Sequence, residues 1–221
     1  MLTVHHLEKS RSHRVIWLLE ELGIPYELKI YKRDPKTLLA PPELKKIHPL
    51  GKSPVITDGS LVVAESGAIL EYLVDKYGKG RFKPEIGTQE FQDYRYFLHY
   101  TEGSLMPYLV MSLVFNMLPQ QPVPFFMKPV MKGISEAVHR MFLYPNLITH
   151  FEFLENHLKK SSWFAGPEMT ATDIQISFAL LSAESKLSSI FNYPKLKSIN
   201  EKFRQRPAFK RALEKGGPIE F

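Results

Sequence analysis

The chain of 221 residues is 44% hydrophobic and 24% charged, which is ordinary for a globular protein large enough to bury a core. It has no cysteine, so disulfides, zinc–thiolate sites and a cysteine nucleophile are excluded. Its net charge is +6, and eight Lys/Arg stand against two Glu over residues 195–215. Such a run would suit a nucleic-acid surface, but no recognised binding motif accompanies it, so we expect a solvated helical face and no nucleic-acid partner.

The N-terminus lacks the apolar segment of a signal peptide, and the longest apolar stretches are too short to cross a membrane. We therefore expect a soluble, cytoplasmic protein with no membrane association. The eight histidines and the acidic residues show no ligand spacing, so no metal site is expected.

The first third of the chain alternates between strand-like and helix-like segments. Residues 2–7 predict a short strand, and residues 11–23 predict an amphipathic helix because apolar side chains recur at helical spacing. Residues 26–31 alternate like a strand, and residues 41–48 begin with two prolines, which is typical of a short helix.

A hairpin and a further helix complete this region. Asp58-Gly59 stands between two apolar runs, the pattern of a type I′ hairpin turn. Residues 66–77 predict a helix that ends before Gly78. The order β-α-β-α-β-β-α predicts two parallel strands joined by a right-handed crossover, followed by an antiparallel hairpin. The result is a mixed four-stranded sheet covered by helices.

Helical periodicity then takes over. Residues 79–87 are rich in glycine and read as a linker between a first domain, 1–78, and an all-helical domain, 88–221. Long helices are predicted over 88–118 and 125–160. Further on, Thr-Ala-Thr-Asp at positions 170 to 173 forms a capping-box pattern and predicts a helix through the core.

Two places carry candidate chemistry. Ser10 and Ser12 stand where the first strand meets the first helix, so each is either a helix cap or a functional hydroxyl. Glu65 ends a strand and Ser66 opens a helix, whose free amides attract an anion while the carboxylate attracts a cation. Together the two residues could bind the α-carboxylate and the α-amine of an amino acid. Alternatively, Ser66 is an ordinary helix cap and Glu65 is an exposed acid beside it.

Four segments, taken in order, resemble the cytosolic glutathione transferases over essentially the whole chain. They are SRSHRVIWLLEELGIPYE, HPLGKSPVITD, LVVAESGAILEYL and MTATDIQISFAL. The residues of these segments are most similar to those of the serine-type, theta-like bacterial and fungal members. The resemblance implies a thioredoxin-like α/β domain followed by an all-α domain, a homodimer, and glutathione as co-substrate with no permanently bound cofactor.

The resemblance also implies which residues bind and activate glutathione. In the theta-like group the hydroxyl donor lies four residues before an arginine on the first helix; here Arg14 points to Ser10, with Ser12 as the fallback. The Ser-Pro-Val segment is similar to the family's cis-proline turn. This implies that Pro54 makes the turn and that the backbone of Val55 pairs with the cysteinyl part of glutathione.

The remaining ligand contacts follow from the same resemblance. Glu65 and Ser66 match the family's clamp on the γ-glutamyl group, and Lys52 stands where a basic or amide side chain meets the glycyl end. Glu102, from the partner subunit, is a candidate to reach the γ-glutamyl amine.

The resemblance implies that the protein directs glutathione to small apolar electrophiles or peroxides, which is the chemistry of detoxification. The family's acceptor pocket lies between the domains, and Leu7, Met106 and Leu109 are candidates for its wall, although the same side chains suit a core. Two alternatives remain open. One is a glutathione-dependent disulfide reductase, which without cysteine requires two glutathiones; the other is a non-catalytic binding or regulatory protein of the same fold.

Overall fold

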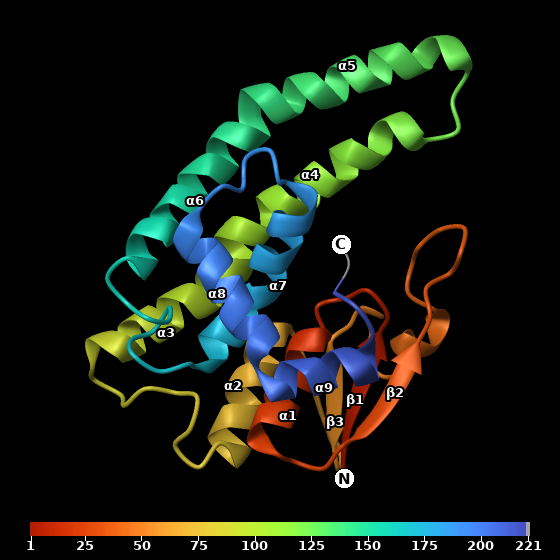
Figure 1. Cartoon of the computed structure of the whole chain (residues 1–221). Coiled ribbons are helices and arrows are strands. Elements are labelled where there is room, and N and C mark those ends of the chain that lie inside the picture. The colour runs from red at the N-terminus through yellow and green to blue at the C-terminus, as the bar shows by residue number, and fades with distance from the viewer. Residues whose placement is uncertain (220–221) are drawn as a thin grey trace.

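The computed structural model describes residues 1–219 and has an α/β part followed by a helical part (Figure 1). The sheet has the strand order β2-β1-β3-β4. β1 (Leu2–Leu7) pairs in parallel with β2 (Glu27–Tyr31) and antiparallel with β3 (Val55–Asp58), which pairs antiparallel with β4 (Leu61–Ala64). The mixed four-stranded sheet expected from the sequence is therefore confirmed.

The helices of the α/β part begin and end close to the expected residues. α1 (His13–Leu22) starts two residues later than predicted and ends at Gly23, whose φ of 70° is left-handed. α2 (Ser66–Tyr77) has the predicted bounds, and the segment between β2 and β3 contains the 3₁₀ turn η1 (Pro42–Lys46).

The hairpin turn differs from the sequence prediction by one residue. Asp58 pairs directly with Leu61, so Gly59 and Ser60 are the two residues of the turn. Gly59 has a φ of 63°, whereas Ser60 is not among the residues with positive φ. A positive φ at the first turn position alone is typical of type II′ rather than type I′ turns. The prediction of a type I′ turn at Asp58-Gly59 was wrong because cross-strand pairing extends one residue further than assumed.

The helical part packs around one buried helix, α7 (Ala171–Lys186). The other helices are α3 (Gln89–Tyr100), α4 (Met106–Met117), α5 (Lys128–Val138), α6 (Tyr144–Leu158), α8 (Pro194–Gln205) and α9 (Pro207–Gly216). α7 begins with the expected capping box between Thr170 and Asp173. Residues 220–221 of the predicted helical domain lie outside the described residues.

Single π turns interrupt the two long helices expected from the sequence. η2 (Thr101–Leu105) separates α3 from α4, and η5 (His139–Leu143) separates α5 from α6. π turns are rare, occur mostly as single turns inside longer helices, and are frequent at functional sites. Within residues 1–219, no helix is both long and apolar enough to cross a membrane.

The C-terminal helices fold back onto α1 (Figure 1). Arg206 of the turn before α9 bonds to Glu21 at 2.5 Å, and Arg211 and Lys215 of α9 both bond to Glu20. Half of the eight basic residues of the terminal segment pair with carboxylates, since Arg204 also binds Glu184. These four side chains are therefore both paired and partly solvated, since Arg206 is 32% exposed and the other three are 40–48% exposed.

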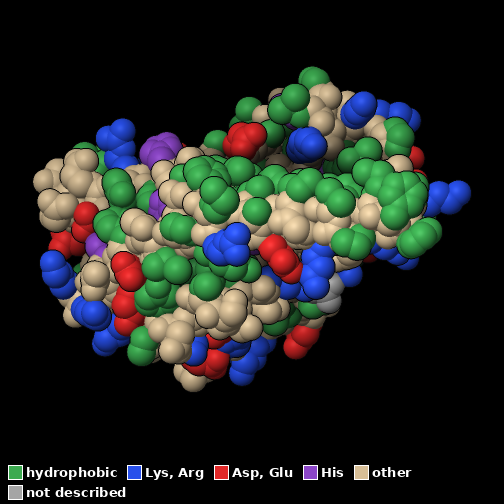
Figure 2. Space-filling model, turned by 90° about the horizontal axis from the view of Figure 1, so that it is seen from above, with side chains coloured by type: hydrophobic (Ala, Val, Ile, Leu, Met, Phe, Trp, Pro, Cys, Tyr) green, Lys and Arg blue, Asp and Glu red, His purple; other side chains and the backbone are tan. Residues whose placement is uncertain are grey.

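α4 and α5 form an arm that projects from the rest of the molecule (Figure 1). Its exposed side chains include large apolar ones, and Figure 2 shows hydrophobic side chains gathered in a row on the face seen from above. The exposed large apolar side chains of residues 125–134 are Phe125, Phe126, Met127, Val130 and Ile134.

Candidate functional site

One row of the sheet brings together the ends of three strands. His5 of β1 pairs with Val55 of β3, which pairs with Ala64 of β4. Because neighbouring strands run antiparallel here, the loop after β1, the turn before β3 and the start of α2 all leave the same edge of the sheet. The topology therefore places Ser10, Pro54 and Glu65 around one edge.

Ser53 connects the turn before β3 to the end of β1. Its hydroxyl oxygen accepts a hydrogen bond from the Leu7 backbone at 3.2 Å, and its hydrogen is donated to the His5 carbonyl at 3.0 Å. The Ser53–Pro54 peptide bond is cis, the less common form for such a bond and the one that the family resemblance implies. Lys52, two residues before Pro54, is exposed.

The start of α2 has an unusual backbone. Glu65 is exposed and has a φ of 72°, a left-handed conformation that costs a non-glycine residue about 1–3 kcal/mol and often marks a functional site. Ser66 follows as the first residue of the helix and is buried. The strained backbone at Glu65 is thus kept immediately beside the free amides of the α2 N-terminus.

A buried arginine connects this edge to the helical part. The Arg14 side chain is only 1% exposed, and its Nη1 donates to Ser66 Oγ at 3.1 Å and to Glu102 Oε1 at 2.5 Å. Its guanidinium lies 5.4 Å from the centre of the Phe178 ring on α7. Burial lowers the pKa of Arg14, and the Glu102 carboxylate opposes that effect by stabilising the cation.

Glu102 lies on the π turn η2 and forms ion pairs with two arginines of its own chain. Besides Arg14, it binds Arg11, whose Nη1 lies 2.7 Å from Glu102 Oε2. The role expected of Glu102 toward a second subunit stays a prediction. Within one chain its position joins the loop after β1 to the helical part.

The two candidate serines have different surroundings. Ser12 is completely buried, and its Oγ lies 2.7 Å from His6 Nδ1 and 2.7 Å from Ser10 Oγ. Although Ser12 occupies the cap position of α1, its hydroxyl makes no capping hydrogen bond. Ser10 is partly exposed, so it is the serine of this pair that a ligand can reach directly.

The candidate electrophile-pocket residues are all buried. Leu109 lines a recess of about 380 Å³ between α4 and the end of α7, together with residues such as Ser112, Leu113 and Ser182. Leu7 and Met106 are 4% and 1% exposed and do not line that recess. Of the three candidates, Leu109 therefore lines this recess, whereas Leu7 and Met106 do not.

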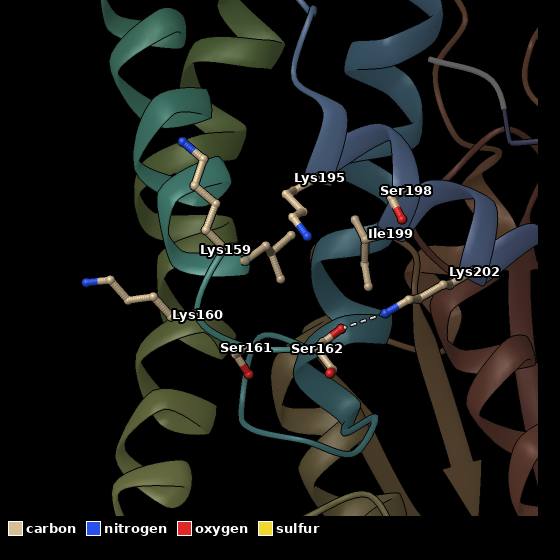
Figure 3. A pocket seen from close by; sticks show the side chains of 9 residues that line it. Lys159, Lys160, Ser161, Ser162, Lys195, Ser198, Ile199 and Lys202 are labelled. Carbon is tan, nitrogen blue, oxygen red and sulfur yellow. Dashed lines mark hydrogen bonds between the residues drawn. The ribbon is translucent and has the colours of Figure 1, made fainter.

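A second recess, of about 270 Å³, lies between the end of α6 and α8 (Figure 3). Lys195 and Lys202 reach toward it, whereas Lys159 and Lys160 extend away. Lys202 donates to the Ser162 carbonyl at 3.0 Å. All four lysines are exposed, as expected of solvated side chains. Among residues 1–219, no group of three or more acidic or histidine side chains could hold a metal ion.

From the sequence, Arg14 served as a spacing marker and as a cation that could help to stabilise the thiolate, and His6 had no assigned role. The burial of Arg14 had a weak signal in the sequence, because Arg14 lies four residues before Leu18 and therefore on the apolar face of α1. The partners of both residues, Glu102 and the C-terminal Gly216, lie far away in sequence, where no local pattern points to them.

Comparisons with known proteins agree with this architecture. Residues 1–75 match the family model of the glutathione S-transferase N-terminal domain, and residues 123–216 match that of the C-terminal domain. Glutathione S-transferase 3 of Schizosaccharomyces pombe is 37% identical over 97% of this chain and 88% of its own length. The disulfide-bond oxidoreductase YfcG of Escherichia coli is 28% identical over 97% of this chain and 95% of its own. A solved glutathione S-transferase from Actinobacillus pleuropneumoniae has a TM-score of 0.80 at 34% identity, covering 99% of this chain and 94% of that one.

Replacing Glu102 with Gln should destabilise the fold by about 3 kcal/mol, because the buried Arg14 cation loses its charged partner. Replacing Arg11 with Gln is the matched comparison and should cost less than about 1 kcal/mol, since the Arg11 side chain is 38% exposed. Urea unfolding of both variants measures the difference. Equal losses of stability would contradict the role assigned to Arg14.

Proposed function

The chain belongs to the glutathione transferase family, and we propose that it binds glutathione and directs the thiolate to small apolar electrophiles or peroxides. The observation that carries the proposal is the placement of Ser10, the cis Ser53–Pro54 turn and the Glu65–Ser66 pair around one edge of the sheet. We place the protein in the cytoplasm as part of the same proposal, since a chain without cysteine suits a reducing compartment.

The chemical step needs a thiolate, which glutathione itself supplies. A free thiol with a pKa of about 8.5 is only about 3% ionised at neutral pH. Lowering that pKa by about two units raises the ionised fraction to roughly three quarters and requires about 2.7 kcal/mol of preferential stabilisation of the anion. One hydrogen bond from Ser10 contributes about 1.5–3 kcal/mol, and the start of α1 adds about 0.3–1 kcal/mol. Ser10 acts here as a hydrogen-bond donor and not as a nucleophile.

The γ-glutamyl end of glutathione carries both a carboxylate and an amine. Ser66 Oγ accepts a hydrogen bond from Arg14, so the hydroxyl hydrogen of Ser66 stays available for a ligand carboxylate. The nearby Arg14 cation favours the same anion. Glu65 would receive the amine, the Val55 backbone would pair with the cysteinyl part, and Lys52 would meet the glycyl carboxylate.

The acceptor substrate requires an apolar space beside the thiolate. The recess between α4 and the end of α7, lined by Leu109, is open and partly apolar and is our candidate for this space, although none of its lining residues belongs to the proposed glutathione site. Leu7 and Met106 would then contribute packing behind the wall rather than contacts.

A homodimer is part of the same proposal. The exposed apolar row on the α4–α5 arm supports it, since apolar patches of this kind mark protein–protein contacts. Glu102 of a partner subunit would contribute to ligand binding only in such an assembly.

Disulfide reduction is the second candidate activity. The similarity to a disulfide-bond oxidoreductase over nearly the whole chain favours it. Because this chain has no cysteine, one glutathione would attack the substrate disulfide and a second would resolve the mixed disulfide.

The protein should be retained on immobilised glutathione and should conjugate glutathione to a chloronitrobenzene. Reduction of a small disulfide without conjugation would favour the second activity instead. A chain that neither binds glutathione nor turns over either substrate would contradict the enzymatic proposal.

Replacing Ser10 with Ala should lower turnover by about tenfold to about 100-fold, the equivalent of one lost hydrogen bond to an anion. Glutathione affinity should change by less than about threefold. Steady-state kinetics and calorimetry separate the two quantities. If Ser12→Ala lowers turnover and Ser10→Ala does not, the assignment of Ser10 is wrong.

Replacing Glu65 with Gln should weaken glutathione binding by about tenfold or more, because the ligand amine loses a charged partner. Glu71→Gln makes the same chemical change further along α2 and should leave the affinity unaltered. Calorimetric titration of both variants gives the comparison. Equal affinities for Glu65→Gln and the wild type would contradict the γ-glutamyl clamp.

A further inference from the structure

A continuous row of hydrogen bonds links the end of α9 to Ser10. The carbonyl of Gly216 lies 2.8 Å from His6 Nε2, His6 Nδ1 lies 2.7 Å from Ser12 Oγ, and Ser12 Oγ lies 2.7 Å from Ser10 Oγ. His6 and Ser12 are both buried, so water does not compete for these contacts.

The Gly216 carbonyl determines the direction of every hydrogen bond in this row. A carbonyl can only accept, so His6 Nε2 must carry a hydrogen. Burial lowers the pKa of His6, so the ring is neutral and its Nδ1 is an acceptor. The Ser12 hydroxyl has two acceptors, His6 Nδ1 at 2.7 Å and the Leu7 carbonyl at 3.5 Å, and it donates to the nearer one. Since Ser12 has one hydrogen, Ser10 must donate to Ser12. In the free protein the Ser10 hydrogen thus points into the protein.

We propose that His6 is the proton acceptor of a relay through Ser12 and Ser10 that ionises bound glutathione. In the step, the S–H bond of glutathione breaks and its proton passes to Ser10 Oγ. Ser10 passes its hydrogen to Ser12, Ser12 passes its own to His6 Nδ1, and the electron pair stays on sulfur. Each hydrogen bond reverses, which leaves the Ser10 hydroxyl donating to the new thiolate. This inference rests on the proposed function.

Burial disfavours a proton on His6, and two neighbouring groups partly offset this effect. Its Nε2–H remains bonded to the Gly216 carbonyl, and the Glu8 carboxylate favours the charged ring. His13, the other titratable group that acts on His6 from α1, stays neutral because burial lowers its pKa to about 3. The thiolate and the imidazolium then form an internal ion pair, so the proton transfer does not change the total charge of the protein and its ligand.

Gly216 allows the end of α9 to approach Ile16 of α1 closely. A Cβ at this position would lie 2.8 Å from Ile16 Cδ1, which is too close for an unchanged structure, and 3.5 Å from His6 Nε2, which is an ordinary contact. The ion pairs of Arg211 and Lys215 with Glu20 hold α9 against α1 in this position. The basic C-terminal segment therefore has a structural role in placing the acceptor carbonyl.

The distinguishing measurement is the number of protons released to buffer for each thiolate formed when glutathione binds. Thiolate is followed by its ultraviolet absorbance, and proton release by calorimetry in buffers of different ionisation enthalpy. The wild-type protein should release far less than about one proton per thiolate, because His6 retains it. In His6→Asn, whose amide can bond to Ser12 but cannot accept a proton, release should rise to about one. Turnover should fall by about 100-fold.

His5→Asn is the matched control, because His5 neighbours His6 on β1 but bonds to Tyr31 and not to the serines. It should behave as the wild type. Ser12→Ala interrupts the relay without altering the histidine, so it tests the inference even if His6→Asn fails to fold, and it should also release about one proton. Release of a full proton by the wild type, or equal release by the wild type and Ser12→Ala, would overturn the relay and leave the proposed function standing. A wild-type chain that does not bind glutathione would overturn the proposed function and the relay with it.

Discussion

The buried guanidinium of Arg14 is the constraint on which the rest of the architecture depends. A cation with almost no exposed surface is strongly destabilising unless its partners are held in place. Arg14 finds them on α2, through Ser66, and on the π turn η2, through Glu102, while its flat face lies over Phe178 of α7. One side chain of α1 thereby fixes the start of α2 and the helical part around a single edge of the sheet.

The C-terminal helices impose a second constraint on the same edge from the opposite side of α1. Trp17 of α1 packs against the rings of Phe203 and Phe209, and carboxylates of α1 bind the basic side chains of the terminal segment. Because α9 is held in this way, its last carbonyl reaches His6 across 210 positions of sequence. The hydroxyls of Ser12 and Ser10 are thus connected, through His6, to the end of α9.

Local patterns were sufficient to predict most of the secondary structure. The first strand, α2 and the capping box before α7 follow from periodicity and caps, which act over a few residues. The turn at Gly59-Ser60 was displaced by one residue because strand register, and not the Asp-Gly pair, decides where pairing ends. The family resemblance pointed to Ser10, with Ser12 as the fallback, but the contacts of Arg14 with Glu102 and of His6 with Gly216 could not be predicted. They join residues that only the tertiary fold brings together.

The central claim is that the Ser10 hydroxyl donates a hydrogen bond to the sulfur of glutathione while Ser12 stays hydrogen-bonded to His6. A crystal structure of the protein with glutathione bound tests this most directly. The account predicts the sulfur within about 3.5 Å of Ser10 Oγ, with Ser12 Oγ still beside His6 Nδ1. Sulfur placed against Ser12, or against neither serine, would contradict it.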